Sequence, residues 1–153
     1  MKIIQKLSSV ALLFTLLGCT EKLPSSHVEH VMPKDMTSDQ MEDVALYIKE
    51  YEKLPTFYMT KKEARSKGWE GGALNQVIEG KAIGGDVFGN YEGVLPEIDG
   101  TYYECDIDTL NKESRGTKRI VYNDDSLDID IYYTDDHYET FDLLYGDGLY
   151  EGH

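Results

Sequence analysis

The regular alternation of side chains between Thr101 and Ile107 is the feature that most constrains the fold. Tyr102, Glu104 and Asp106 occupy one set of alternate positions, and Tyr103, Cys105 and Ile107 occupy the other. Because successive side chains of a strand point to opposite faces, this pattern predicts a strand with one carboxylate-bearing face and one mainly apolar face. Further strands are expected at 86–88, 119–122, 127–133 and 138–144, the last of them after a turn at 134–137.

The segment before these strands has helical periodicity instead. Thr37 and Gln40 have the spacing of a capping box, and apolar residues follow at helical spacing, which predicts a helix over 37–54. Thr60 and Glu63 repeat the spacing and predict a second helix over 60–68, with a short helical piece at 73–77. Helices followed by strands indicate an α+β fold, in which N-terminal helices pack on an antiparallel β-sheet.

Residues 1–18 have the layout of a signal peptide. Lys2 and Lys6 precede a charge-free and largely apolar run over 7–17, which is too short to remain as a membrane-spanning helix. The run leads into Leu-Leu-Gly and then Cys19, an ending that resembles the lipobox of bacterial lipoproteins. The resemblance implies cleavage before Cys19 and lipid attachment to it. A simple cleaved signal that happens to end near a cysteine is the alternative, and both interpretations imply export.

The remaining chain is long enough for one domain. Residues 19–36 are polar and contain two prolines, so we interpret them as a tether. A single domain is expected over 37–145, and a loose polar tail over 146–153. We expect a monomer that is exported and either anchored to the bacterial membrane through Cys19 or extracellular. With Cys19 lipidated, Cys105 has no disulfide partner and is expected to be a buried, unreactive thiol.

The overall charge argues against a nucleic-acid partner. The chain has 15 basic and 29 acidic residues, and removal of residues 1–18 takes away two lysines and no acid, so the formal charge of −14 becomes −16. Phosphate groups are bound by cations, so composition alone disfavours RNA or DNA. The aspartates between 124 and 136 could offer oxygens to calcium, but they form no EF-hand loop. Since no Cys/His pairs stand at ligand spacing, we expect no metal and no cofactor.

Five residues could carry chemistry, although each also has an ordinary structural interpretation. His137 lies in a turn between two predicted strands, whereas the other three histidines lie in the tether or at the last position. Glu104 is an acid with aromatic neighbours, and it could be a plain surface carboxylate. Lys61 opposes the helix dipole at a first helical turn. Arg115 and Arg119 could simply offset nearby aspartates.

Several short blocks, taken together and in order, resemble the barnase-type microbial ribonucleases. They are YMTKKEA (58–64), GW (68–69), IGGDVFGNYEG (83–93) with LP (95–96), YECDI (103–107), RGTKRIVY (115–122) and TDDHYETF (134–141). The resemblance covers about 44–141. It implies N-terminal helices on an antiparallel sheet, and a metal-independent endoribonuclease that cuts single-stranded RNA by transphosphorylation to a 2′,3′-cyclic phosphate.

The resemblance also implies a role for each of the five residues. Glu104 matches the general base that takes the proton of the 2′-hydroxyl, and His137 matches the general acid that protonates the leaving 5′-oxygen. Lys61, Arg115 and Arg119 match the cations that hold the scissile phosphate. Because the 2′-hydroxyl of the substrate is the nucleophile, the mechanism needs no metal and excludes DNA.

A second set of residues matches the guanine-binding loop of the family. It comprises Phe88, Gly89, Asn90, Tyr91 and Glu92, together with Tyr138, which could pack on the base. The usual arginine of this loop is replaced by Tyr91, which can stack on a base but brings no positive charge. Apart from this replacement, the loop matches the family, and the resemblance implies cleavage with a guanine preference. The alternative is a catalytically inactive, surface-anchored binding module on the same fold.

A protein inhibitor is a further partner that the resemblance implies, because an active ribonuclease endangers its maker. The usual inhibitor in this family is acidic and plugs a basic cleft. An acidic chain makes that electrostatic match poor. Either a differently charged inhibitor exists or rapid export suffices.

Overall fold

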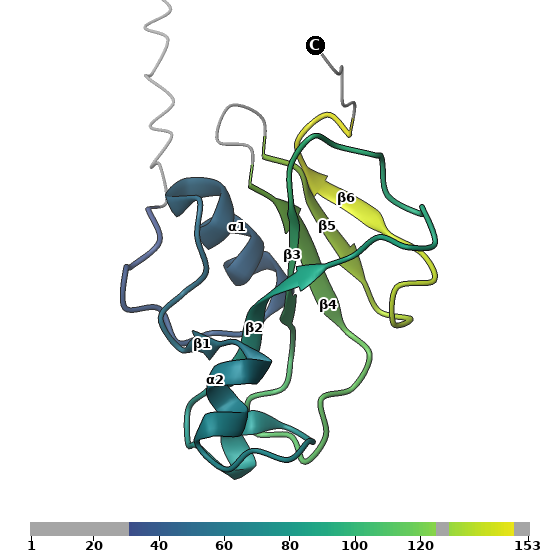
Figure 1. Cartoon of the computed structure of the whole chain (residues 1–153). Helices are drawn as coiled ribbons and strands as arrows, with labels where there is room; N and C mark the ends of the chain where they lie inside the picture. Colours follow the sequence, from purple (N-terminus) through teal and green to yellow (C-terminus); the bar gives the residue numbers. More distant parts are fainter. Residues whose placement is uncertain (1–30, 125–128, 149–153) are drawn as a thin grey trace, which may run out of the picture.

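A computed structural model of the protein describes residues 31–124 and 129–148, and the expected signal peptide and Cys19 lie outside these ranges. In chain order the elements are α1 (Met41–Tyr51), β1 (Tyr58–Met59), α2 (Lys61–Ser66), the 3-10 turn η1 (Leu74–Gln76), β2 (Ala82–Phe88), β3 (Tyr102–Asp106), β4 (Arg119–Asn123), β5 (Ile131–Thr134) and β6 (Asp142–Tyr145). The strands form one sheet in the order β1-β2-β3-β4-β5-β6 (Figure 1). The pair β1–β2 is parallel, and the other pairs are antiparallel. The expected α+β class is confirmed, with a parallel pair at one edge.

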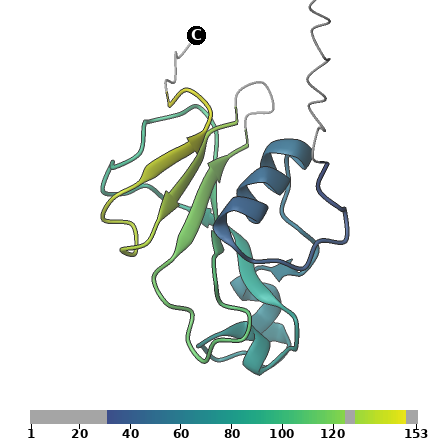
Figure 2. The same cartoon turned by 180° about the vertical axis from the view of Figure 1, so that it is seen from behind.

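The helix α1 covers one face of the sheet, as the front and back views show (Figures 1 and 2). Its buried residues Val44, Ala45, Tyr47 and Ile48 share a core with Cys105, Ile120 and Ile131. Because β3 alternates, burying Cys105 under α1 directs its neighbours Glu104 and Asp106 to the opposite face. No helix within the described ranges is both long and apolar enough to cross a membrane.

The short helix α2 begins where its sequence predicts. The Thr60 hydroxyl accepts a hydrogen bond from the Glu63 amide at 3.3 Å, and the Glu63 carboxylate accepts one from the Thr60 amide at 2.8 Å. This reciprocal pair is the predicted capping box, which satisfies two amides at the helix start. The amide of Lys61, the first helical residue, is bound instead by the Asp86 carboxylate at 2.9 Å. The start of α2 is therefore fixed to β2.

The capping box predicted at Thr37 and Gln40 is wrong. The helix α1 begins at Met41, and its N-cap Gln40 makes no side-chain capping bond. The Asp39 carboxylate accepts hydrogen bonds from the amides of Thr109 and Leu110, 2.5 and 2.7 Å away. The chain before α1 is therefore tied through Asp39 to the segment after β3. The helix ends at Tyr51, three residues before the predicted end.

The end of the expected tether packs against α1. Met32 and Met36 are buried in the core. The Met32 amide donates to Glu50 at 2.8 Å, and the Tyr51 hydroxyl donates to the Met32 carbonyl. The packed part of the chain therefore includes residues before position 37, because the Met32 and Met36 side chains are buried in the core that α1 forms.

The last strand is shorter than the alternation predicts. β6 spans Asp142–Tyr145, and residues 135–141 form a loop in place of the strand expected from position 138. The Asp136 carboxylate accepts hydrogen bonds from the amides of Glu139 and Thr140, both at 3.0 Å. These bonds favour a compact turn over an extended strand. Of the expected tail, residues 146–148 are described, and the Gly148 amide donates to Asp130 at 3.1 Å.

Candidate active site

Glu104 lies at the centre of the sheet face that α1 leaves uncovered. It is buried on β3, with 7% of its surface exposed. The Lys61 ammonium lies 2.5 Å from Oε1, and the Tyr138 hydroxyl donates a hydrogen bond to Oε2. Donors from α2 and from the loop after β5 therefore hold the two carboxylate oxygens. Such partners stabilise an ionised carboxylate that has lost most of its contact with water.

Two arginines converge on Asp106, the next residue on the same face of β3. Arg115 forms a bidentate pair with Asp106, with both N···O distances at 2.7 Å. These hydrogen bonds raise the pKa of Arg115 above its ordinary value. The Nε atom of Arg119 lies 3.1 Å from Asp106 Oδ1, but its N–H is not aligned on any acceptor in the described part of the chain. This second contact is therefore an ionic attraction without a well-aligned hydrogen bond.

The backbone of the 115–118 turn fixes the rest of Arg119. Its two terminal nitrogens donate to the carbonyls of Lys118 at 2.7 Å and Gly116 at 3.1 Å. Arg119 is itself only 2% exposed. Asp106 and Arg119 are also direct partners in the β3–β4 register. A buried carboxylate, two arginines and a turn thus form one fixed cationic unit next to Glu104.

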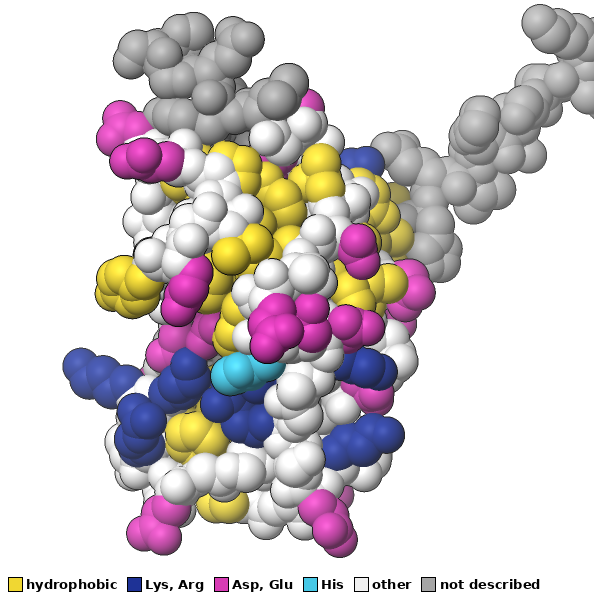
Figure 3. All heavy atoms as spheres, turned by 90° about the vertical axis from the view of Figure 1, so that its right-hand side faces the viewer, with side chains coloured by type: hydrophobic (Ala, Val, Ile, Leu, Met, Phe, Trp, Pro, Cys, Tyr) yellow, Lys and Arg dark blue, Asp and Glu magenta, His cyan; other side chains and the backbone are white. Residues whose placement is uncertain are grey.

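His137 lies in the loop that connects β5 to β6. Its ring centroid is 4.8 Å from the ring centroid of Tyr138, the residue that binds Glu104. His137 itself is exposed, and both residues have left-handed backbone angles, φ 61° and 75°. Such angles are unusual outside glycine, and the Asp136 bonds hold the loop that contains them. In Figure 3 the histidine side chain lies beside a group of Lys and Arg side chains and below a band of acidic ones.

The 88–92 segment lies next to Tyr138. The Phe88 ring stacks on the Tyr138 ring with a centroid distance of 5.1 Å. The Asn90 side chain closes the loop through two hydrogen bonds to Leu95, at 2.9 and 3.1 Å. Tyr91 is 94% exposed. Gly89 passes so close beneath the Tyr91 ring that a Cβ atom there would lie 2.2 Å from it.

A groove of about 570 Å³ adjoins this loop. Its lining includes Phe88, Gly89, Asn90, Leu95 and Tyr102. Glu92 is exposed and is not among its lining residues. The structure thus gathers Lys61, Glu104, Arg115, Arg119, His137 and Tyr138 in one region, with the 88–92 loop at its border.

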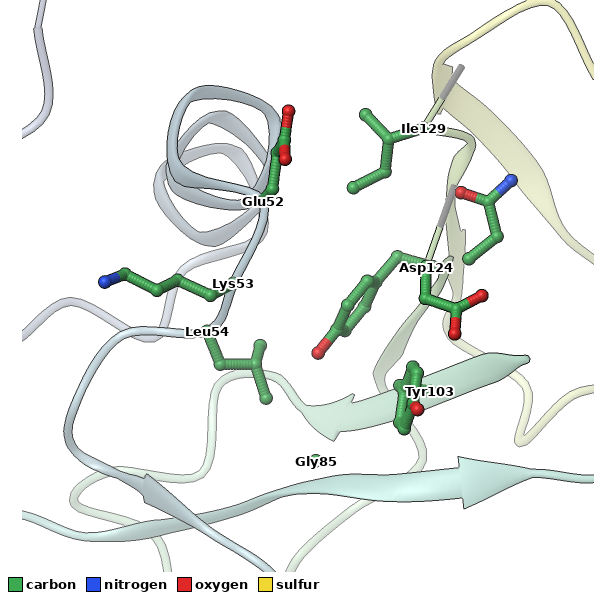
Figure 4. A pocket seen from close by; sticks show the side chains of 9 residues that line it. Glu52, Lys53, Leu54, Gly85, Tyr103, Asp124 and Ile129 are labelled. Atoms are coloured by element: carbon green, nitrogen blue, oxygen red, sulfur yellow. The ribbon is translucent and has the colours of Figure 1, made fainter. Parts of the chain in front are cut away.

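A second cavity, of about 280 Å³, belongs to the opposite side of the sheet, near the C-terminal end of α1. Leu54 and Ile129 point into it from two sides, beside Tyr103, and Lys53 points away (Figure 4). None of the residues expected to act on a substrate lines this cavity. We therefore do not assign it to the candidate active site.

Asp106 is a site residue that the local sequence pattern did not predict. Its position two residues after Glu104 places it on the same strand face, which is a usable signal. Its two arginine partners are 9 and 13 positions away along the chain. That pairing depends on the sheet register, which local patterns do not reveal.

Known proteins resemble the chain over most of the described part. A family model described as ribonuclease matches residues 27–145. A ribonuclease of Heyndrickxia coagulans is 46% identical over 101 residues, which cover 64% of this chain and 89% of the relative. A ribonuclease of Bacillus intermedius is also 46% identical over 101 residues, but the match covers 60% of its length. The guanyl-specific ribonuclease St of Saccharopolyspora erythraea is 42% identical over 60 residues, covering 39% of this chain and 56% of the relative.

The fold and the matched range define the class of the protein: it belongs to the ribonuclease family. Each of these relatives is named as a ribonuclease. The alternative of an inactive binding module on the same fold finds no support among them.

Proposed function

We propose that the protein is a metal-independent endoribonuclease whose active site is built around Glu104. The assignment of the site rests on one observation. The Glu104 carboxylate is held between Lys61 and Tyr138, beside the two arginines that Asp106 fixes. A carboxylate next to several cations suits a reaction that removes a proton from a substrate while negative charge builds up on its phosphate.

The first reaction step is a transphosphorylation within the RNA chain. Glu104 takes the proton of the 2′-hydroxyl, and the 2′-oxygen attacks the adjacent phosphorus. The bond between phosphorus and the 5′-oxygen breaks, and His137 gives that oxygen a proton. The products are a 2′,3′-cyclic phosphate and a 5′-hydroxyl. Water then opens the cyclic phosphate slowly, with the proton roles of the two residues reversed.

Lys61, Arg115 and Arg119 stabilise the charge that develops on the non-bridging phosphate oxygens. Arg115 and Arg119 are held in place before substrate arrives, because Asp106 and turn carbonyls fix their guanidinium groups. Preorganised cations need little rearrangement during the reaction, and water exclusion strengthens their effect. Asp106 is thus a positioning residue for the two arginines.

The 88–92 loop is proposed to select guanine. Backbone groups of this loop and the Glu92 carboxylate would pair with the edge of the base, and Tyr138 would pack on it. The observed Phe88–Tyr138 stack gives the base an aromatic neighbour between the loop and Glu104. Two relatives bear the name guanyl-specific ribonuclease, from Saccharopolyspora erythraea and Kitasatospora aureofaciens, which supports this preference.

A substrate with one altered sugar tests the reaction type. We expect the full chain to cut a short RNA that contains one guanosine, and to leave intact the same RNA with 2′-deoxyguanosine at that position. The 5′ fragment should carry a 2′,3′-cyclic phosphate early in the reaction. Cleavage of the deoxy-substituted RNA at that position would rule out the mechanism, since no 2′-hydroxyl is present to attack.

We also propose export and anchoring through Cys19, on the basis of the sequence pattern over 1–19. The residues concerned lie outside the described ranges. A Cys19→Ser variant expressed in a bacterium should lose membrane association and appear in the soluble exported fraction. Unchanged membrane association of the variant would contradict lipid anchoring while leaving the catalytic proposal intact.

A further inference from the structure

The cavity of about 280 Å³ near the end of α1 has an aromatic wall. Tyr103 and Tyr122 are direct partners in the β3–β4 register, and their ring centroids lie 5.9 Å apart. Both residues line the cavity, together with the aliphatic side chains of Leu54 and Ile129 (Figure 4). Gly85 of β2 also lines it, and its lack of a side chain leaves the space open. The cavity therefore offers aromatic and aliphatic contacts to an apolar ligand body.

A carboxylate stands beside this cavity at an unfavourable place on α1. Glu52 lines the cavity and is the C-cap of the helix, with a left-handed backbone at φ 53°. The C-terminal end of a helix carries partial negative charge, which favours a cation there and disfavours an acid. Glu52 is exposed, and within the described ranges it forms no ion pair and no side-chain hydrogen bond. The helix end and the carboxylate thus both attract a positive charge.

The lysines at this end of α1 are directed elsewhere. The Lys49 ammonium lies over the Tyr145 ring, 4.5 Å from its centroid. Lys53 points away from the cavity, although its stem contributes to the lining (Figure 4). Asp124 also lines the cavity and adds a second carboxylate, of which Oδ1 accepts a hydrogen bond from the Thr101 amide at 2.9 Å. The described lining therefore contains two acids and no cation directed into the cavity.

These features together favour an organic cation over a metal ion. Tyrosine rings attract a cation through their π-electrons, and carboxylates attract it through their charge. A metal ion would use neither the rings nor the aliphatic side chains. Within the part of the chain that the structure describes, no group of three or more His, Cys, Asp or Glu side chains could hold a metal. The volume lies near the lower end of the range for ligand pockets, which indicates a small molecule.

We propose that this cavity binds a small organic cation with an alkylated ammonium group. Glu52 faces the charge, and the rings of Tyr103 and Tyr122 contact the alkyl groups on the nitrogen. Tyr103 and Glu104 are neighbours on β3, so the cavity and the candidate active site lie on opposite faces of the sheet. The inference therefore does not rest on the proposed function. Because Glu52 and Asp124 repel a phosphate, the ligand is a free cation and not a phospholipid headgroup.

Titration of the full chain with choline, followed by NMR, tests the proposal. Choline chloride replaces sodium chloride at constant total salt, so that general screening stays the same. We expect a Kd of about 1 mM or below, with shifts at Gly85 and Tyr103. The neutral isostere, in which carbon replaces the choline nitrogen, should bind at least about tenfold more weakly. Equal affinity for the two compounds, or no shift at the cavity, would overturn the proposal.

Glycerophosphocholine distinguishes a free cation from a lipid headgroup. It carries the same trimethylammonium group and adds a negatively charged phosphodiester. We expect it to bind more weakly than choline, because the two carboxylates beside the cavity repel the phosphate. Equal or tighter binding would contradict the assignment to a free cation.

Two charge-neutralising variants test the part that Glu52 plays. Glu52→Gln should lower the affinity for choline about three- to tenfold. Glu70→Gln removes the same charge from an exposed position after α2, at the other end of the molecule from the cavity (Figure 1), and should leave the affinity unchanged. Glu52→Gln removes an acid from a helix C-terminus, so its Tm should not fall. Equal affinities of the two variants would contradict a role for Glu52.

Tyr103→Leu tests the aromatic wall. The variant keeps an apolar side chain but removes the ring, so it should weaken the binding of choline more than the binding of the neutral isostere. An equal loss for both compounds would show that the ring contributes only apolar surface, against a cation site. None of these measurements requires cleavage of RNA, so they remain decisive even if the proposed function fails.

Discussion

Tyr138 donates its hydroxyl hydrogen bond to Glu104, which lies 34 positions earlier in the sequence. The contact joins the loop that carries His137 to the middle of the sheet. Burial, followed by the negative charge of Glu104, raises the pKa of Tyr138 above its ordinary value. The tyrosine therefore keeps its proton through the neutral range and remains a donor to the carboxylate.

Tyr138→Phe should reduce catalysis more than it reduces stability. The variant keeps the ring that stacks on Phe88 but loses the hydrogen bond to Glu104. Without this bond the Glu104 carboxylate loses one of the two donors that orient it, so we expect kcat to fall roughly tenfold or more. Steady-state kinetics on a guanosine-containing RNA measures the effect. An unchanged kcat would show that the hydroxyl does not assist the base.

Asp106→Asn should lower both stability and activity. The substitution leaves Arg119 buried without its carboxylate and removes the bidentate partner of Arg115. Breaking a buried pair in this way costs about 3 kcal/mol or more in the free energy of unfolding. Urea unfolding measures this cost. Asp108→Asn is a suitable control. Within the described ranges the ion pairs of Asp108 are with the exposed lysines 112 and 118, so the substitution should change the free energy of unfolding by less than about 1 kcal/mol.

Stability should depend on pH through Asp136. Hydrogen bonds from the Thr140 hydroxyl and amide and from the Thr134 hydroxyl lower the pKa of Asp136 from 3.8 to about 2. Because the folded pKa is the lower one, these bonds contribute stability above about pH 4 that is lost as the pH falls toward 2. Between these values the Tm of the unmodified chain should fall more steeply than that of Asp136→Asn. Parallel curves for the two proteins would show that the bonds do not contribute.

Tyr91→Arg should strengthen RNA binding. Tyr91 is 94% exposed in a loop where the resembling family has an arginine, so a longer cation can be accommodated there without repacking. We expect kcat/KM to rise about three- to tenfold at low salt and the gain to shrink as salt is added. Tyr91→Gln, which adds no charge, is the control. A gain of equal size in the glutamine variant would assign the effect to loss of the tyrosine ring.

Local patterns predicted the parts of the fold that local interactions determine. The capping box of Thr60 and Glu63 forms as expected, because its bonds join residues three positions apart. The alternation of β3 correctly placed Glu104 opposite the core, since side-chain direction follows from strand geometry alone. The same kind of spacing failed at Thr37, because the residues before α1 bind the segment after β3 instead.

The arrangement of the site required tertiary information. The match of short blocks to a family suggested which residues act, but not how they are held. The Asp106–Arg119 pairing depends on the β3–β4 register, and the Glu104–Tyr138 contact depends on a loop that the alternation pattern had assigned to a strand. In that loop the side-chain bonds of Asp136 outweigh the strand tendency of the residues after it.

The most direct test of catalysis by Glu104 and His137 is the cleavage of short fluorogenic RNAs. The full chain is compared with its Glu104→Ala and His137→Ala variants. The RNAs differ only in the base 5′ to the cut. We expect efficient cleavage by the unmodified chain, fastest after guanine, and a loss of at least about a hundredfold in each variant, which is the usual contribution of a general base or acid. Absence of cleavage by the unmodified chain across a range of pH at low salt, or full activity in either variant, would contradict this expectation.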